Sequence, residues 1–149
     1  MQLEKEINTA RFESRHQQAI VNVLYTFNWC NDKLKQLIVP YDITTQQFNV
    51  LRILRGQFPV PSTINLLKAR MLDKMCDASR IVDRLVQKDL VEKAPNPSDK
   101  RSVSIVISGK GLALLMKMDD EISISDIISS HLTEDEAIQL NLLLDKMRG

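Results

Sequence analysis

Two short runs of β-forming residues flank a loop in the stretch LVEKAPNPSDKRSVSIVIS, from Leu90 to Ser108. The second run alternates branched apolar residues with serine at most positions, which is typical of a strand with one buried face. The loop holds two prolines and then Asp99, Lys100 and Arg101, instead of the Asn-Gly or Asp-Gly of a tight hairpin. We predict a β-hairpin over Leu90–Ala94 and Ser102–Ile107 whose tip carries one acid and two bases.

Helical signals dominate the rest of the chain. Apolar residues recur at helical intervals before Pro40, and capping-box pairs stand at Thr44 with Gln47 and at Thr133 with Glu136. Ser108 is suited to cap the helix that follows the hairpin. We therefore predict helices at about 7–37, 44–56, 62–71, 75–89, 109–129 and 133–148.

A short helix, a turn, a second helix and then a hairpin is the plan of a winged helix-turn-helix. The predicted fold is mainly α with a small β-hairpin wing, in a single domain over residues 1–149 with a winged core at about 44–108. The flanking segments, about 7–38 and 109–148, carry more apolar surface than this core needs. A homodimer would bury that surface; packing of these helices on their own domain is the alternative.

The helix predicted before the hairpin has two different faces. Its apolar stripe, suited to the core, is Ala78, Ile81, Val82, Leu85 and Val86. The opposite stripe is Ser79, Arg80, Asp83, Arg84 and Gln87. Arg can bond guanine and Gln adenine in the major groove. A mixed polar face is also what any solvated helix shows, and Asp77 and Asp83 would repel phosphate.

Charge is unevenly distributed although the net charge is only +1. Residues 66–101 hold nine Lys and Arg against six Asp and Glu, whereas residues 102–149 hold four against eight. A polyanion should therefore meet the middle of the chain.

Three segments give this chain a resemblance to the MarR (multiple antibiotic resistance regulator) family of cytoplasmic, dimeric transcription factors. They are the recognition-helix type sequence SRIVDRL at 79–85, the wing sequence DKR at 99–101 and ISGKG at 107–111. The resemblance implies binding of a pseudo-palindromic double-stranded DNA operator, with a recognition helix at about 76–88 in the major groove and the wing, 95–101, in the minor groove. The implied DNA-binding residues are Ser79, Arg80, Arg84, Gln87, Lys100 and Arg101, with Asp99 holding Arg101 or a nearby backbone donor in place.

The chain departs from the family at one position, and the resemblance has one further implication. Where the family usually has Gly after the recognition helix, this chain has Asp89, which tolerates a left-handed backbone less well than Gly. The family also implies a small-molecule effector that relieves repression, and the candidate pocket residues are Tyr25, Trp29, Phe48 and Arg52. Such side chains at helical spacing are more often part of a core.

Other chemistry is weakly supported by the sequence. His16 and His131 have no ligands at metal spacing, and no motif of an enzyme or a cofactor site stands out. Cys30 and Cys76 are too far apart in sequence for a metal motif, which suits a reducing cytoplasm. Cys76 would begin the recognition helix, where a lowered thiol pKa would permit redox sensing, whereas Cys30 reads as a buried apolar residue.

No apolar run reaches the length of a membrane span, and the charged amino terminus does not resemble a signal peptide. The alternative to a DNA-binding regulator is a winged-helix module that has lost DNA binding and docks proteins through the same face.

Overall fold

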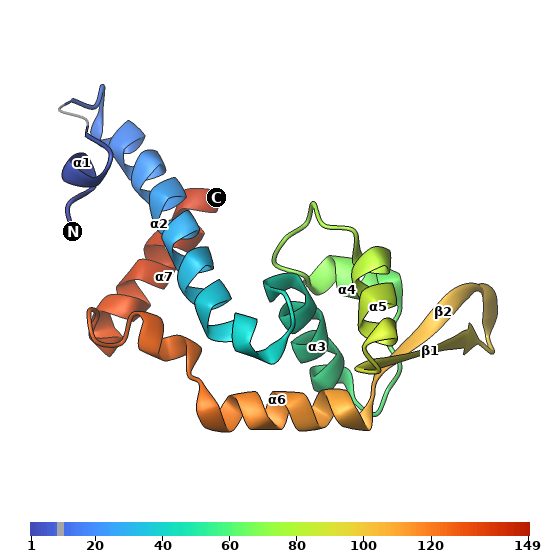
Figure 1. The fold of residues 1–149 in the computed structure, drawn as a ribbon. Coiled ribbons are helices and arrows are strands. Elements are labelled where there is room, and N and C mark those ends of the chain that lie inside the picture. Colours follow the sequence, from blue (N-terminus) through green and yellow to red (C-terminus); the bar gives the residue numbers. More distant parts are fainter. Residues whose placement is uncertain (9–10) are drawn as a thin grey trace. The chain divides into compact units, whose positions relative to one another are not determined.

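The computed structural model describes residues 1–8 and 11–149 (Figure 1). The chain forms two compact units, one comprising Met1–Gln36 and Ser123–Gly149, the other Leu37–Ile122.

The first unit is helical. It contains α1 (Leu3–Glu6), most of α2 (Arg15–Ile38), the 3-10 turn η2 (Ile124–Ile127) and α7 (Glu134–Arg148). The prediction that the first long helix begins at Ile7 is wrong, because α2 begins at Arg15. The reason is local: the Ser14 hydroxyl accepts a hydrogen bond from the Gln17 N–H at 3.1 Å, as a helix-capping side chain does.

The first unit leaves much of its apolar surface exposed. Among the described residues of this unit, Leu3 has the only buried apolar side chain. Large apolar residues on α2 and α7 are more than two-fifths exposed: Ile20, Leu24, Phe27, Ile138, Leu140, Leu142, Leu143 and Met147. The capping box predicted at the start of α7 is confirmed, since Thr133 and Glu136 bond each other's backbone N–H groups.

The second unit holds the core. It contains η1 (Val39–Tyr41), α3 (Thr45–Gln57), α4 (Ile64–Arg70), α5 (Ala78–Gln87), β1 (Val91–Asn96), β2 (Asp99–Ile107) and α6 (Gly109–Glu121). The predicted capping box at the start of α3 is confirmed, with the Gln47 N–H donating to the Thr44 hydroxyl at 3.1 Å. Fully buried side chains come from α3, α4, α5, β2 and α6, among them Leu51, Leu67, Leu85, Ile105 and Leu115.

The hairpin is longer than predicted. β1 and β2 pair antiparallel from Val91 with Ile107 to Asn96 with Asp99, so the turn is Pro97-Ser98, and Lys100 and Arg101 lie at the start of β2. The predicted loop at 95–101 is shorter in the structure, because Pro95 and Asn96 belong to β1 and residues 99–101 to β2. Pro95 is accommodated beside a register shift near the tip, where the pairing does not need its missing N–H. Ser62 adds a bridge on the other side of β2, exchanging backbone hydrogen bonds with Ile105 at 2.8 and 2.9 Å.

The helix after the hairpin is shorter than predicted. Ser108 caps α6 through the Gly111 N–H, as expected, but α6 ends at Glu121 instead of continuing to Ser129, and Ile122 is extended. The sequence that follows, ISISDIIS, alternates β-branched isoleucine with serine, and both residue types are poor helix formers.

The junction between α5 and β1 contains the left-handed residue expected there. Asp89 has a φ of +59°, and its carbonyl accepts a hydrogen bond from the Ser108 hydroxyl at 2.7 Å. A side chain at Gly111 would meet the Leu90 carbonyl oxygen. The close approach of α6 to this junction therefore requires glycine at 111.

Candidate nucleic-acid interface

Helix α5 begins two residues later than predicted for the recognition helix. Asp77 has a non-helical backbone, and its carboxylate accepts a hydrogen bond from the Arg80 N–H at 3.1 Å, so it is the N-cap. Cys76 therefore lies in the loop before the helix. Three residues of the predicted core stripe, Ala78, Val82 and Leu85, are buried, whereas Ile81 and Val86 are half-buried. Helix α5 packs against α3, α4 and β1.

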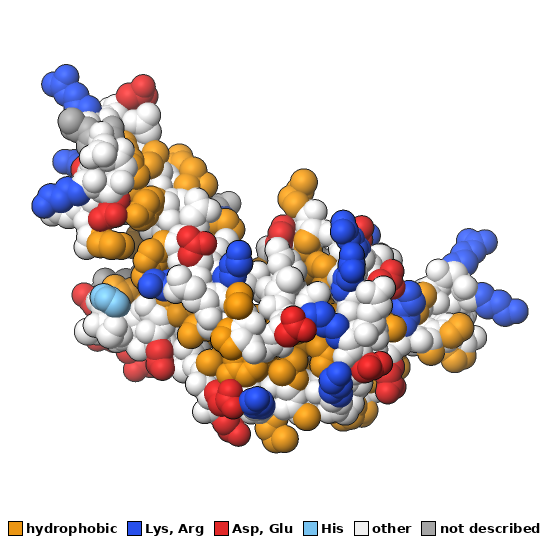
Figure 2. All heavy atoms as spheres, in the orientation of Figure 1, with side chains coloured by type: hydrophobic (Ala, Val, Ile, Leu, Met, Phe, Trp, Pro, Cys, Tyr) orange, Lys and Arg blue, Asp and Glu red, His pale blue; other side chains and the backbone are white. Residues whose placement is uncertain are grey.

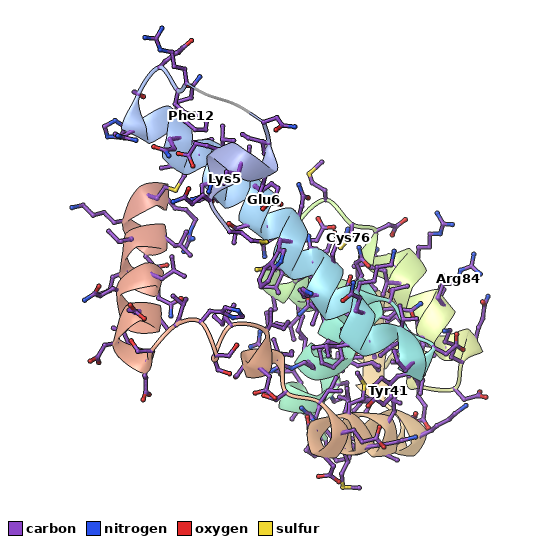
Figure 3. The ribbon with its side chains drawn as sticks, turned by 60° about the vertical axis from the view of Figure 1, so that its left-hand side comes forward. Lys5, Glu6, Phe12, Tyr41, Cys76 and Arg84 are labelled. Carbon is purple, nitrogen blue, oxygen red and sulfur yellow. The ribbon has the colours of Figure 1, made fainter. Side chains whose placement is uncertain are left out.

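The opposite face of α5 is open to solvent. The predicted base-reading and phosphate-binding side chains on it are all exposed: Ser79, Arg80, Arg84 and Gln87. Lys and Arg side chains gather over this helix and at the end of the hairpin in Figure 2, and Figure 3 shows Arg84 projecting away from α5. Neither Arg80 nor Arg84 forms an ion pair with any described residue. Both guanidinium groups are therefore available to an external anion.

The two acids that seemed to disfavour phosphate binding have structural partners. Asp77 caps α5, and the Asp83 carboxylate lies 2.7 Å from the ammonium nitrogen of Lys93 on β1. Sequence reasoning missed Lys93, because the packing of β1 against α5 that brings it to Asp83 cannot be read from local periodicity. This pairing offsets the negative charge on the exposed face of α5.

The wing carries two exposed basic side chains, and hydrogen bonds hold the backbone around them. The Asp99 carboxylate accepts a hydrogen bond from the Arg101 backbone N–H at 2.9 Å. The Asn96 side chain accepts from the Ser98 N–H and donates to the Ser102 hydroxyl, both at 3.0 Å. Lys100 and Arg101 are exposed. The bond from Asp99 therefore goes to the backbone of Arg101, one of the two partners considered for it.

The condition considered for redox sensing at Cys76, a lowered thiol pKa, is not met in the structure. Burial raises the pKa of the Cys76 thiol, and the negative charges of Asp73 and Asp77 raise it further, against a smaller opposing effect of a backbone hydrogen bond. The thiol is outside the helix whose amino terminus was expected to stabilise the thiolate. Burial likewise raises the pKa of Cys30.

The four residues predicted for an effector pocket lie in different units. Tyr25 and Trp29 belong to α2 in the first unit, whereas Phe48 and Arg52 belong to α3 in the second. Arg52 lies 5.6 Å from the centre of the Phe48 ring, and Phe48 is buried. That all four line one effector site stays a prediction.

Metal-binding and membrane-spanning features are absent from residues 1–8 and 11–149. This part of the chain contains no cluster of three or more His, Cys, Asp or Glu side chains arranged to hold a metal ion. None of its helices combines the length and the apolar character needed to cross a bilayer.

Comparison with known proteins identifies the family. A family profile described as the MarR family matches residues 43–103. The multiple antibiotic resistance protein MarR of Escherichia coli is 31% identical over 128 residues, covering 84% of this chain and 88% of that protein. The chain belongs to the MarR family. The transcriptional repressor NicR of Pseudomonas putida is 34% identical over 106 residues, covering 70% of this chain and 66% of NicR.

The solved structures agree with this assignment to the MarR family. A cysteine-to-serine mutant of Escherichia coli MarR complexed with operator DNA is 29% identical, covers 99% of both chains and has a TM-score of 0.74. The winged helix-turn-helix fold class is thus confirmed. NicR is a transcriptional repressor and the Escherichia coli MarR mutant is bound to operator DNA, so the comparisons do not favour a winged-helix module that has lost DNA binding.

Proposed function

We propose that this MarR-family protein is a sequence-specific DNA-binding repressor that works as a homodimer in the cytoplasm. In each protomer α5 enters the major groove of the operator and the β1–β2 wing reaches the adjacent minor groove. The observation that carries the proposal is the exposed face of α5, where Arg80 and Arg84 have no acidic partner among the described residues while Asp77 and Asp83 are each engaged.

The roles of individual residues follow from their reach and chemistry. Arg80 and Arg84 are one turn apart and can each make bidentate bonds to guanine. Gln87 suits adenine, and Ser79, at the amino-terminal end of the helix, suits phosphate. Arg101 on the wing suits the negative potential of a narrow, A·T-rich minor groove, and Lys100 suits the backbone beside it.

The homodimer is supported by the surface of the first unit. Its helices α2 and α7 expose the apolar residues named above, and a second copy would cover them. A two-fold dimer presents two copies of α5, so the operator should be a pseudo-palindrome with half-sites about 10 base pairs or a multiple apart. The winged core, about 44–108, would read DNA, and the flanking segments would hold the protomers together.

The test combines selection with a salt titration. DNA selected by the purified protein from a random duplex pool should contain the pseudo-palindrome, and light scattering should give twice the 17.1 kDa mass of the chain. The logarithm of the affinity for random duplex should fall steeply with the logarithm of the salt concentration, because neutralised phosphates release counterions. A flat salt dependence, or selection of no common sequence, would refute DNA-specific binding, and a stable monomer would refute the dimer.

That an effector relieves repression, through Tyr25, Trp29, Phe48 and Arg52 or elsewhere, is a further part of the proposal. It is supported by family membership, and it is tested by screening small molecules for release of the selected operator.

A further inference from the structure

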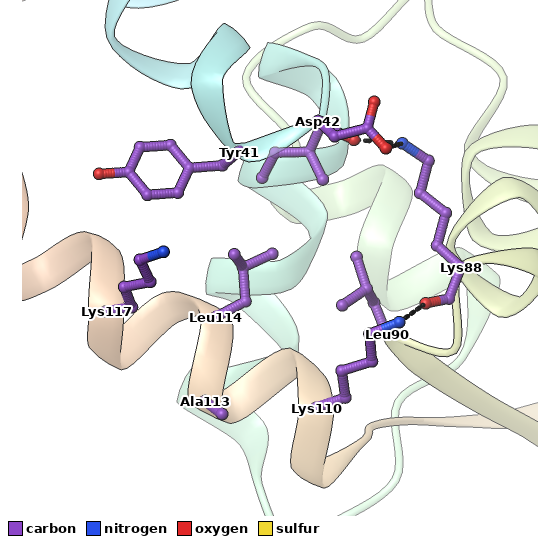
Figure 4. A pocket seen from close by; sticks show the side chains of 9 residues that line it. Tyr41, Asp42, Lys88, Leu90, Lys110, Ala113, Leu114 and Lys117 are labelled. Carbon is purple, nitrogen blue, oxygen red and sulfur yellow. Dashed lines mark hydrogen bonds and ion pairs between the residues drawn. The ribbon is translucent and has the colours of Figure 1, made fainter.

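The second unit contains a pocket that is distinct from the exposed face of α5. Its volume is about 570 Å³, within the range of small-molecule sites. It is formed by η1 and the residues after it, the junction between α5 and β1, and one side of α6 (Figure 4). It shares no residue with the effector set predicted from sequence.

Helix α6 supplies a patterned wall. Lys110, Ala113, Leu114 and Lys117 line the pocket and follow the i, i+3, i+4, i+7 spacing of one helix face. An ammonium group therefore stands at each end of an apolar strip. Lys117 is seven positions after Lys110, which is a rise of about 10.5 Å along the helix axis. Ile43 and Leu90 extend the apolar lining.

The charges around the pocket leave a cationic excess. Lys88 is the third lining lysine, and its ammonium nitrogen is 3.5 Å from the Asp42 carboxylate, the only acid that lines the pocket. Lys110 has no acidic partner among the described residues and donates to the Lys88 carbonyl at 3.1 Å. Lys117 has only a 4.0 Å contact with Glu121, which also accepts a 2.6 Å hydrogen bond from the Tyr41 hydroxyl. An ammonium group has three donors, so Lys110 and Lys117 can each bond a further anion.

We propose that this pocket binds a small organic dianion with an acidic group at each end of an apolar body. One acidic group would bond Lys110 beside Lys88, and the other would bond Lys117. The apolar body would lie over Ala113 and Leu114. A pocket with two ammonium groups and an apolar strip between them should prefer such a dianion to two other anions. Inorganic phosphate has no apolar body to cover the strip, and a fatty acid has only one acidic end.

The probe is azelate, a nine-carbon dicarboxylate whose extended length matches the spacing of Lys110 and Lys117. Its matched control is nonanoate, which has the same chain length and one carboxylate. Titration calorimetry should show azelate binding about tenfold more tightly than nonanoate, the contribution of one charge-assisted bond. Equal affinities would overturn the proposal.

Variants locate the binding. Lys117→Met should reduce azelate affinity about tenfold and leave nonanoate affinity unchanged, whereas Lys68→Met, which removes the same charge from an exposed position on α4 outside the pocket, should change neither. Ala113→Phe keeps every lysine and fills the strip, so it should abolish azelate binding while the circular dichroism spectrum stays that of the wild type. Equal losses for Lys117→Met and Lys68→Met, or retained binding in a folded Ala113→Phe protein, would place azelate elsewhere.

The pocket also touches the carboxyl end of the proposed DNA-reading helix, because Lys88 is the C-cap residue of α5. Resting on the proposed function, we expect azelate to change operator affinity in the wild type and not in Lys117→Met. Calorimetry without DNA tests the site, and operator binding without azelate tests the proposed function, so the two can fail separately. Azelate binding with unchanged operator affinity would refute the coupling to α5.

Discussion

The carboxylate of Asp99 accepts a hydrogen bond from the backbone N–H of Arg101, at 2.9 Å, and thereby fixes the start of β2. Asp99 adds a negative charge to a surface proposed to face DNA. Its bond to Arg101 provides a reason for an acid at this position, because a fixed backbone reduces the ordering cost of placing the guanidinium in the groove.

Substitutions at Asp99 separate its hydrogen bond from its charge. Asp99→Ala removes both, and we expect weaker operator binding. Asp99→Asn keeps an acceptor oxygen and removes the charge, so binding should equal or exceed that of the wild type. Fluorescence anisotropy with labelled operator measures both. If Asp99→Ala binds more tightly than the wild type, the electrostatic effect dominates and the positioning role is wrong.

Arg101→Ala should weaken operator binding and leave the thermal midpoint nearly unchanged, because this exposed side chain contributes nothing to the core. Combined with Asp99→Ala it should bind about as well as Arg101→Ala alone, with a coupling energy of about 1 kcal/mol. Replacing A·T pairs under the wing by G·C should penalise the wild type more than Arg101→Ala. Identical penalties would show that Arg101 is not in the minor groove.

Arg80→Ala and Arg84→Ala distinguish base reading from phosphate binding. If an arginine reads guanine, its removal should weaken the binding free energy by about 1–3 kcal/mol per half-site and relax the sequence preference at one base-pair position. Binding to operator and to random duplex is compared for each variant. An equal loss on both DNAs would instead assign that arginine to phosphate.

The ion pair between Asp83 and Lys93 should matter more to DNA binding than to folding. Both side chains are substantially exposed, 56% and 40%, so breaking the pair should change the free energy of unfolding by less than about 1 kcal/mol. Lys93→Met leaves Asp83 uncompensated and should weaken binding to operator and random duplex alike. Adding Asp83→Asn should restore much of the loss, and failure to restore it would mean that Lys93 contacts phosphate directly.

Ser62→Ala should stabilise the protein. The Ser62 hydroxyl is buried and has no hydrogen-bond partner in the described part of the chain. Removing an unsatisfied hydroxyl should raise the free energy of unfolding by about 1 kcal/mol, since its desolvation is not offset in the folded state. The backbone bonds of residue 62 to Ile105 would remain. Urea denaturation measures the change, and destabilisation would indicate that the hydroxyl has a partner in solution.

Cys76 should react slowly at neutral pH. Burial and the charges of Asp73 and Asp77 raise its pKa, so the thiolate fraction is small at pH 7 and grows only as the pH rises through that raised value. In a Cys30→Ser background, iodoacetamide should alkylate Cys76 more slowly than free cysteine. Asp73→Asn should speed the reaction at fixed pH. Fast alkylation near pH 6 would restore the redox-sensing hypothesis.

The sequence by itself determined which residues cap three of the helices and which face of α5 turns to the core. The capping pairs at Thr44–Gln47 and Thr133–Glu136, the Ser108 cap and the apolar stripe of α5 all act within a few residues along the chain. Local hydrogen bonding and helical periodicity therefore suffice to predict them. The same local patterns predicted the order of elements, and the family resemblance, carried by residues 79–85, 99–101 and 107–111, supplied the expectation of operator DNA as the partner.

Only the tertiary structure decided which distant residues meet. The register of β1 on β2 extends both strands into the predicted loop, and the packing of β1 against α5 brings Lys93 to Asp83. In the pocket beside α6, the Lys110 ammonium group donates a hydrogen bond to the carbonyl of Lys88, so residues that precede and follow the hairpin meet. These relationships depend on strand register and on the approach of α6 to the end of α5, which non-local packing sets. Hydrophobic periodicity in a sequence predicts which face of a helix or strand is buried, but it does not predict which other element covers that face.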